Sequence, residues 1–91
     1  MKKIKNGKNL RFHLVFRPEP EGGFTVLVPS LPGCITYGKN LAEARRMAAD
    51  AIGAYLASLR KHNELIPNDD DIFTTSITFP DKKAGRAVAY V

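Results

Sequence analysis

The residues that could do chemistry in this chain are nine carboxylates, two histidines and one cysteine. A nuclease that uses two metal ions needs several carboxylates that converge on them. The alternating segment 10–17, the first predicted strand, contains neither Asp nor Glu. The acids fall instead in predicted turns, on a predicted helix and in a connector: Glu19, Glu21, Glu43, Asp50, Glu64, Asp69, Asp70, Asp71 and Asp81. The sequence therefore predicts no catalytic residues, no metal site and no cofactor.

The histidines and the cysteine are predicted to be structural. His13 should project from the wet face of the first strand, and His62 should lie in the last turn of a helix, so both are predicted to be surface residues. Cys34 follows a Pro-Gly corner with no base placed beside it, which predicts a small buried residue. The run Asp69–Asp71 lacks the spacing of a calcium loop and is predicted to be a solvated connector.

The elements that position these residues are predicted from hydrophobic periodicity. Alternation of apolar and polar residues predicts strands at 10–17, 24–28, 34–37 and 72–79. The breaker-rich segment 18–23 should join the first two strands in an antiparallel hairpin. The last strand follows a crossover helix and is predicted to lie parallel to the first, with its inner face formed by Phe73, Thr75, Ile77 and Phe79.

A long helix over about 41–62 is the best-marked element. Asn40 and Glu43 form a capping-box pattern at its start, and Asn63 can take a left-handed exit at its end. Its core stripe is predicted to be Leu41, Ala44, Ala48, Ala51, Ile52, Tyr55 and Leu59. A corner motif precedes the helix and should act as a structural hinge; with the cap it comprises Pro29, Leu31, Pro32, Gly33, Cys34, Gly38, Asn40 and Glu43.

Length and composition indicate one folded domain over 1–91, with a core at about 10–79. The basic segment 1–9 is not followed by the apolar region of a signal peptide, and no window is apolar enough for a membrane span, so a cytoplasmic protein is expected. Residues 80–91 are predicted to be a turn and a short edge strand or tail. The net charge of +5 leaves two readings open, a solvated basic face and a nucleic-acid partner.

Two surfaces could bind a partner. The helix contact stripe lies opposite the core stripe and comprises Ala42, Arg46, Ala49, Gly53, Ala57 and Arg60. A plain surface of helix formers and a contact surface of small residues are both consistent with it, although glycine costs about 1 kcal/mol relative to alanine inside a helix. The second surface is the uncovered sheet face, with Val15, Leu27 and either Ile35 or Tyr37. With an exposed strand edge, it predicts a homodimer or higher homo-oligomer.

Four runs of the chain carry a family likeness: Phe24–Gly38, Leu41–Ala44, Ala51–Ile52 and Tyr55–Leu56. Together with the element order β-β-β-α-β, they resemble the HicB family of antitoxins from about residue 10 to residue 67. Ser30 and Asn40 depart from the family pattern, which usually has acidic residues at or near these positions. Serine suits a turn and asparagine caps a helix, so the expected geometry is kept.

The resemblance implies an α+β fold, a partial RNase H-like sheet with one long helix packed on one face. It also implies an antitoxin that occludes a small mRNA-cleaving ribonuclease toxin of the HicA type, with no catalytic site of its own. No C-terminal DNA-binding module is predicted, so direct DNA binding is not expected. Because such a toxin should be basic, the acids of the two connectors are candidate contacts: Glu19, Glu21, Asp69, Asp70 and Asp71. The alternative is an orphan relative that binds nucleic acid through its basic N-terminal segment and strand face.

Overall fold

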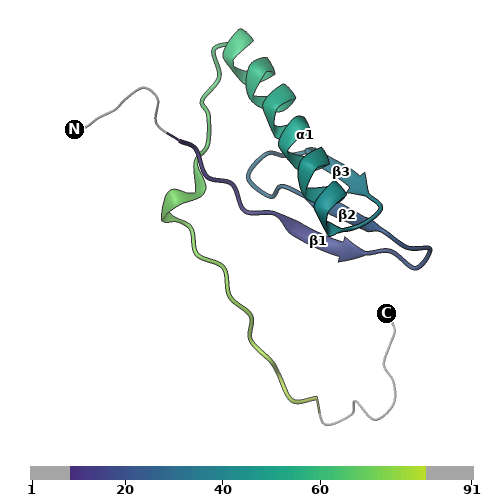
Figure 1. Ribbon diagram of the computed structural model, residues 1–91. Coiled ribbons are helices and arrows are strands. Elements are labelled where there is room, and N and C mark those ends of the chain that lie inside the picture. Colours follow the sequence, from purple (N-terminus) through teal and green to yellow (C-terminus); the bar gives the residue numbers. More distant parts are fainter. Residues whose placement is uncertain (1–8, 82–91) are drawn as a thin grey trace.

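The structure is a computed structural model that describes residues 9–81. Its elements are β1 (Val15–Pro18), β2 (Phe24–Leu27), β3 (Ile35–Gly38), α1 (Leu41–Lys61) and the 3-10 turn η1 (Asp69–Asp71). One antiparallel sheet of three strands, in the order β1-β2-β3, carries α1 on one face (Figure 1). The predicted α+β class with one long helix is confirmed, whereas the RNase H-like assignment stays a prediction.

The β1–β2 hairpin forms as predicted, with Val15 opposite Leu27 and Pro18 opposite Phe24. Two backbone hydrogen bonds close its loop: Glu19 N donates to Gly23 O, and Gly22 N donates to Glu19 O. Both Gly22 and Gly23 have positive φ. β1 begins later than predicted, at Val15 rather than at residue 10. The reason is that the partner strand ends in the corner at 28–34, so the residues before β1 have no neighbouring strand to pair with.

The corner between β2 and β3 is part of the core. Backbone hydrogen bonds run from Leu31 N to Val28 O, from Cys34 N to Leu31 O and from Val28 N to Cys34 O, at 2.9, 2.9 and 3.1 Å. Gly33 supplies the left-handed turn with φ 83°. Leu31 is 1% exposed and Cys34 is buried beside it, which confirms the prediction for the cysteine. The corner therefore places the buried side chains of Leu31 and Cys34 beneath the helix.

The helix begins and ends close to its predicted limits. Asn40 Oδ1 accepts a hydrogen bond from Glu43 N at 2.8 Å, and Glu43 Oε1 accepts one from Lys39 N at 2.7 Å. Asn63 takes the left-handed exit with φ 55°. Gly38 is the last residue of β3, and a side chain there would overlap the backbone of Ala44. Glycine at this position therefore lets the sheet approach α1 closely.

Two adjoining clusters form the core beneath α1. One contains Val26, Ala44 and Ala48, and the other contains Val28, Leu31 and Cys34. The core stripe is confirmed except at its first position: Ala51, Ile52, Tyr55 and Leu59 pack against the second cluster, but Leu41 is 56% exposed. Leu41 is the first residue of α1, and its side chain does not pack against either core cluster.

The predicted strand 72–79 does not form within the single chain, and this expectation was wrong. Residues 72–81, called the arm below, are extended and exposed and run away from the sheet (Figure 1). Phe73, Ile77 and Phe79 are 90%, 83% and 80% exposed, although they were predicted to face inward. The alternation is genuine, but the arm leaves the body before it can reach β1. The predicted edge strand or tail beyond residue 81 and the basic segment 1–8 lie outside the described residues.

Removing the helix cap should have a moderate effect on stability. Asn40→Ala deletes the side-chain acceptor of Glu43 N, and loss of an N-cap costs about 1 kcal/mol. We expect urea denaturation to show this loss in the free energy of unfolding, with Asn40→Ser restoring most of it because serine also caps helices. If alanine and serine gave the same stability, the cap would not stabilise this helix.

Candidate functional site

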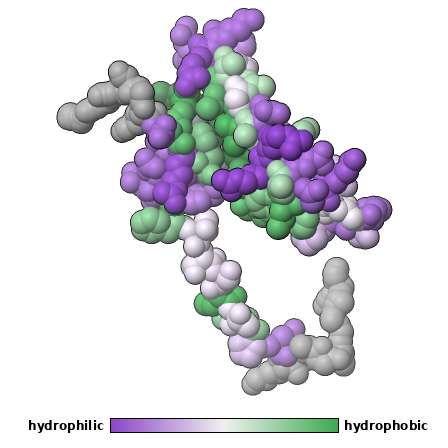
Figure 2. Space-filling model, viewed as in Figure 1, coloured by the Kyte–Doolittle hydropathy of each residue, from purple (hydrophilic) through white to green (hydrophobic). Residues whose placement is uncertain are grey.

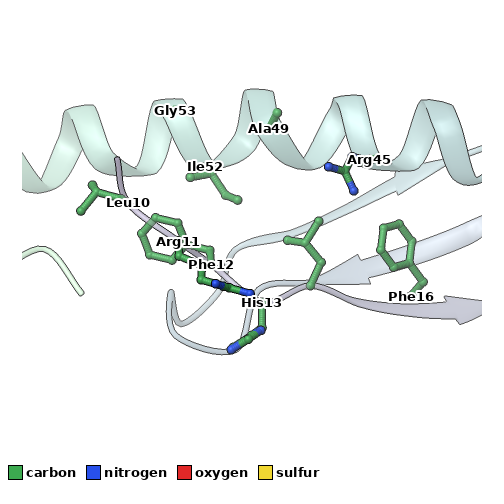
Figure 3. A pocket seen from close by; sticks show the side chains of 10 residues that line it. Leu10, Arg11, Phe12, His13, Phe16, Arg45, Ala49, Ile52 and Gly53 are labelled. Carbon is green, nitrogen blue, oxygen red and sulfur yellow. The ribbon is translucent and has the colours of Figure 1, made fainter. Parts of the chain in front are cut away.

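A groove lies between α1 and the chain segment that leads into β1. Its volume is about 620 Å³, and it is lined by Leu10, Arg11, Phe12, His13, Leu14, Phe16, Arg45, Ala49, Ile52 and Gly53. It exists because α1 packs over β2 and β3, which leaves the β1 side of the sheet uncovered. Ile52 projects from α1 toward the strand, and Phe16 projects from the strand toward α1 (Figure 3). The groove is open to solvent and is lined by both apolar and basic side chains.

The charge around the groove is positive. Arg11 and Arg45 lie on its rim, and its lining contains no carboxylate. Gly53 lies in its wall, where an added Cβ would meet no heavy atom within 4 Å. Hydrophobic residues gather between the helix and the first strand, beside strongly polar ones (Figure 2). The groove can therefore accept an uncharged or acidic apolar segment, and a basic one would be repelled.

A buried carboxylate holds the root of the arm to the body. Asp69 is 1% exposed; its Oδ1 accepts a hydrogen bond from Ser30 Oγ at 2.5 Å and its Oδ2 accepts one from His13 N at 2.8 Å. The hydrogen bond from Ser30 lowers the pKa of Asp69, the His13 backbone N–H and the nearby His13 ring lower it further, and burial opposes them. The carboxylate thus joins three segments: the corner, the approach to β1 and the root of the arm.

Further hydrogen bonds extend this anchor along the chain. Asp69 N donates to Arg11 O at 2.8 Å, and Arg11 N donates to Asn68 Oδ1 at 3.2 Å. His13 Nε2 lies 2.6 Å from the carbonyl oxygen of Ile72. Residues 69–72 therefore lie alongside residues 11–13 and run in the same direction. The root of the predicted last strand thus lies beside its predicted neighbour, and Phe73 and Thr74 still line a pocket with Arg11 and His13.

The solvated-connector prediction was wrong for Asp69, which is buried because Ser30 and the His13 backbone satisfy its oxygens. Asp70 and Asp71 are exposed as predicted. A single sequence carries no signal for this link, since Ser30 and Asp69 are 39 positions apart. His13 is also less free than predicted: it is half-buried, and its ring nitrogen contacts Ile72 O.

The remaining candidate groups do not come together. The Cys34 thiol is buried, and burial raises its pKa, which makes it a poorer nucleophile. His62 is exposed, and its Nδ1 lies 2.8 Å from Ser58 O at the end of the helix. Within residues 9–81, no group of three His, Cys, Asp or Glu side chains could hold a metal ion. Nor does any helix described there have the length and apolarity to cross a membrane.

The predicted acidic contacts form two separate groups. Glu19 and Glu21 lie in the hairpin loop after β1, and η1 lies beside the segment before β1, at the other end of the first strand (Figure 1). Glu19 is half-buried and accepts a hydrogen bond from Thr25 Oγ1. Asp69 is buried and cannot contact a partner. The acids available to a partner are therefore Glu21 at one end, and Asp70 and Asp71 at the other.

The helix contact stripe is exposed along its whole length: Ala42, Arg46, Ala49, Gly53, Ala57 and Arg60. Ala49 and Gly53 also line the groove, so the stripe and the groove overlap at the middle of α1. The guanidinium of Arg46 lies 3.9 Å from Glu43 Oε2, an exposed pair that contributes little to stability. The stripe is thus accessible to a partner, and its role stays a prediction.

The outer face of the sheet is a second exposed apolar surface. Val15 is paired with Leu27, and Leu27 with Ile35, so the three side chains form one row across the strands. Val15, Ile35 and Tyr37 are all exposed. Tyr37 is partly fixed, because its hydroxyl donates to Gly22 O at 2.9 Å. Both Ile35 and Tyr37 therefore add to this face, where the sequence left a choice between them.

Comparison with known proteins matches residues 12–85 to the model of a family described as the HicB-like antitoxin of bacterial toxin-antitoxin systems. The chain belongs to the HicB-like antitoxin family. A UPF0150 protein of Thermoplasma acidophilum is 43% identical over 61 residues, which cover 67% of this chain and 88% of that protein. The resemblance predicted from the Leu31–Cys34 corner and the helix start is confirmed.

Two relatives of this HicB-like chain carry the antitoxin name itself. Antitoxin HicB 1 of Photorhabdus laumondii is 37% identical over 60 residues, which cover 66% of this chain and 39% of that protein. Antitoxin HicB of Escherichia coli K12 is 36% identical over 58 residues, which cover 64% of this chain and 42% of that protein. The chain thus spans less than half the length of these two named antitoxins.

Proposed function

We propose that this HicB-like protein neutralises a small HicA-type ribonuclease toxin by binding it and covering its active site. The observation that carries the proposal is the family match over 12–85. The toxin cleaves mRNA in this proposal, so the protein would act in the cytoplasm, and its role would be regulatory and not enzymatic.

The outer face of the sheet is the toxin contact that we propose. The row Val15, Leu27 and Ile35 spans all three strands, with Val15 and Ile35 exposed and Leu27 half-buried between them. The helix α1 does not cover this row because it packs on the opposite face. The exposed acids at the two ends of β1 would flank a basic toxin docked there. The helix contact stripe is the competing surface.

Co-expression tests the function. The short reading frame beside this gene would be induced alone and together with this protein. We expect its product to arrest growth, this protein to relieve the arrest, and the two to co-purify in a fixed ratio. If the neighbouring product is not toxic, or if relief occurs without a complex, occlusion is wrong. RNA or promoter binding by the isolated chain would instead support the nucleic-acid alternative.

Two matched variants locate the toxin contact. Ile35→Asp places a charge in the outer sheet face, and Ala57→Asp places the same charge on the helix contact stripe away from the groove. Both positions are exposed, so both variants should fold. We expect Ile35→Asp to weaken toxin binding at least about 10-fold, the cost of one unfavourable buried charge, and Ala57→Asp to leave it unchanged. The reverse result would assign the contact to the helix.

A further inference from the structure

An aromatic ring is held in place on the face of the sheet that α1 does not cover (Figure 1). The hydroxyl of Tyr37 donates a hydrogen bond to Gly22 O at 2.9 Å. A Cβ added at Gly23 would lie 2.1 Å from the Tyr37 hydroxyl oxygen, so the ring can lie against the hairpin loop only because residue 23 is glycine. The Tyr37 side chain is nevertheless 49% exposed. The loop therefore fixes the outer end of the ring and leaves part of its surface open to solvent.

A carboxylate is fixed beside this ring. Thr25 is the register partner of Tyr37, so their side chains are neighbours on one face of the sheet. Thr25 Oγ1 donates a hydrogen bond to Glu19 Oε2 at 2.5 Å, which holds the half-buried Glu19 carboxylate next to the pair. Within residues 9–81, Glu19 Oε1 accepts no hydrogen bond and Glu19 forms no ion pair. One oxygen of a positioned carboxylate is therefore available to a donor.

An aromatic ring beside a carboxylate suits a guanidinium group. A guanidinium is planar, stacks on aromatic rings and donates charge-assisted hydrogen bonds to carboxylates, whereas the ammonium of lysine is more strongly hydrated and cannot stack. Glu21, which is exposed in the same loop, adds negative charge. Arg17 also lies on this face, but two strand spacings, about 10 Å, separate its backbone from that of Tyr37. The ring therefore lies between acids on the loop side and no cation on its own strand.

We infer that Tyr37 and Glu19 form a receptor for an arginine side chain of a protein partner, with the guanidinium stacked on the ring and hydrogen-bonded to Glu19 Oε1. The receptor adjoins the apolar row Val15, Leu27 and Ile35, because Leu27 and Ile35 lie two residues away from its members on β2 and β3. The identity of the partner rests on the proposed function: a basic toxin docked on this row would present arginines at its edge. The receptor then makes the surface selective for arginine over lysine.

Nuclear magnetic resonance of the full chain tests the receptor without a toxin. The probe is a capped Gly-Arg-Gly peptide, and the matched control replaces its arginine with citrulline, which has nearly the same shape and no charge. We expect the arginine peptide to shift the ring signals of Tyr37 saturably and to leave those of Tyr55, which packs beneath α1, unchanged. Equal shifts with both peptides would overturn the inference. So would a short oligouridine that shifts Tyr37 when the arginine peptide does not, since Arg17 and Lys39 would then be serving a nucleic acid.

Variants at the receptor test its part in toxin binding. We expect Tyr37→Leu to raise the dissociation constant about 5-fold through loss of the ring, and Glu19→Gln to raise it about 10-fold, while glutamine keeps an oxygen for Thr25. The double variant should lose less than the product of the two, because both side chains bind one guanidinium. Glu64→Gln, the same charge change at an exposed residue after α1, should have no effect.

The two experiments separate this inference from the proposed function. If the toxin is bound and neutralised equally well by the unmodified chain, Tyr37→Leu and Glu19→Gln, occlusion stands and the receptor is wrong. If no toxin is neutralised, the proposed function fails, and the peptide titration still decides whether the receptor binds arginine. Helical circular dichroism of each variant confirms that α1 and its core are intact, since neither position belongs to the core clusters.

Discussion

Leu31→Ala is expected to lower the free energy of unfolding by about 2–5 kcal/mol, the range for truncating a fully buried leucine. Leu31 is 1% exposed and packs with Val28 and Cys34 under the C-terminal half of α1. Its surroundings cannot collapse easily into the cavity, because hydrogen bonds at Val28, Leu31 and Cys34 fix the corner backbone. Urea denaturation followed by helical circular dichroism would measure the loss. In so small a domain, this loss is a large fraction of the total stability.

Leu65→Ala provides the matched control, because it is the same substitution at a residue that is 93% exposed. Its effect should stay within about 0.5 kcal/mol. Because the residue change is the same in both variants, the difference between their losses in free energy of unfolding reports the effect of burial at position 31. Equal effects at positions 31 and 65 would mean that the corner is not part of the core.

Local signals explain the part of the fold that was predictable. The Asn40 cap, the glycine turns and the alternation in β2 each depend on residues a few positions apart, so the sequence alone determines them. The helix ends at Lys61, one residue from its predicted limit, because Asn63 takes the left-handed exit. The buried state of Cys34 was likewise predictable, since a small apolar residue follows the corner that turns beneath the helix.

The binding surfaces were less predictable, because they depend on tertiary placement. The groove arises from α1 lying over β2 and β3 and not over β1, and periodicity carries no such information. Alternation in 72–79 predicted a strand, but this segment runs exposed away from the sheet, because periodicity carries no information on where a segment lies. The burial of Asp69 depends on Ser30, in a corner distant in sequence.

The anchor at Asp69 should have the second large effect on stability. Asp69→Ala leaves Ser30 Oγ and His13 N without their acceptor, and a buried donor that loses its partner costs about 1–3 kcal/mol. We expect the free energy of unfolding to fall by about 3 kcal/mol at neutral pH, because the lost acceptor is charged and serves two donors. Asp71→Ala, an exposed neighbour in the same turn, should change stability by less than about 0.5 kcal/mol. A small effect at both positions would show that the root of the arm is not held by this carboxylate.

The same carboxylate should make stability depend on pH in acid. Folding lowers the pKa of Asp69 below its ordinary value of 3.8, chiefly through the Ser30 hydroxyl and then through the His13 backbone N–H and the His13 ring. A lowered folded-state pKa means that the ionised group stabilises the fold above the unfolded-state pKa. This contribution is lost as the pH falls from about 5 through the folded-state pKa. Urea midpoints at about pH 7 and pH 3 should therefore fall further for the unmodified chain than for Asp69→Asn, which cannot ionise but keeps an oxygen that can accept the hydrogen bond from His13 N. An equal fall in both proteins would assign the acid sensitivity to other carboxylates and would contradict the role of Asp69.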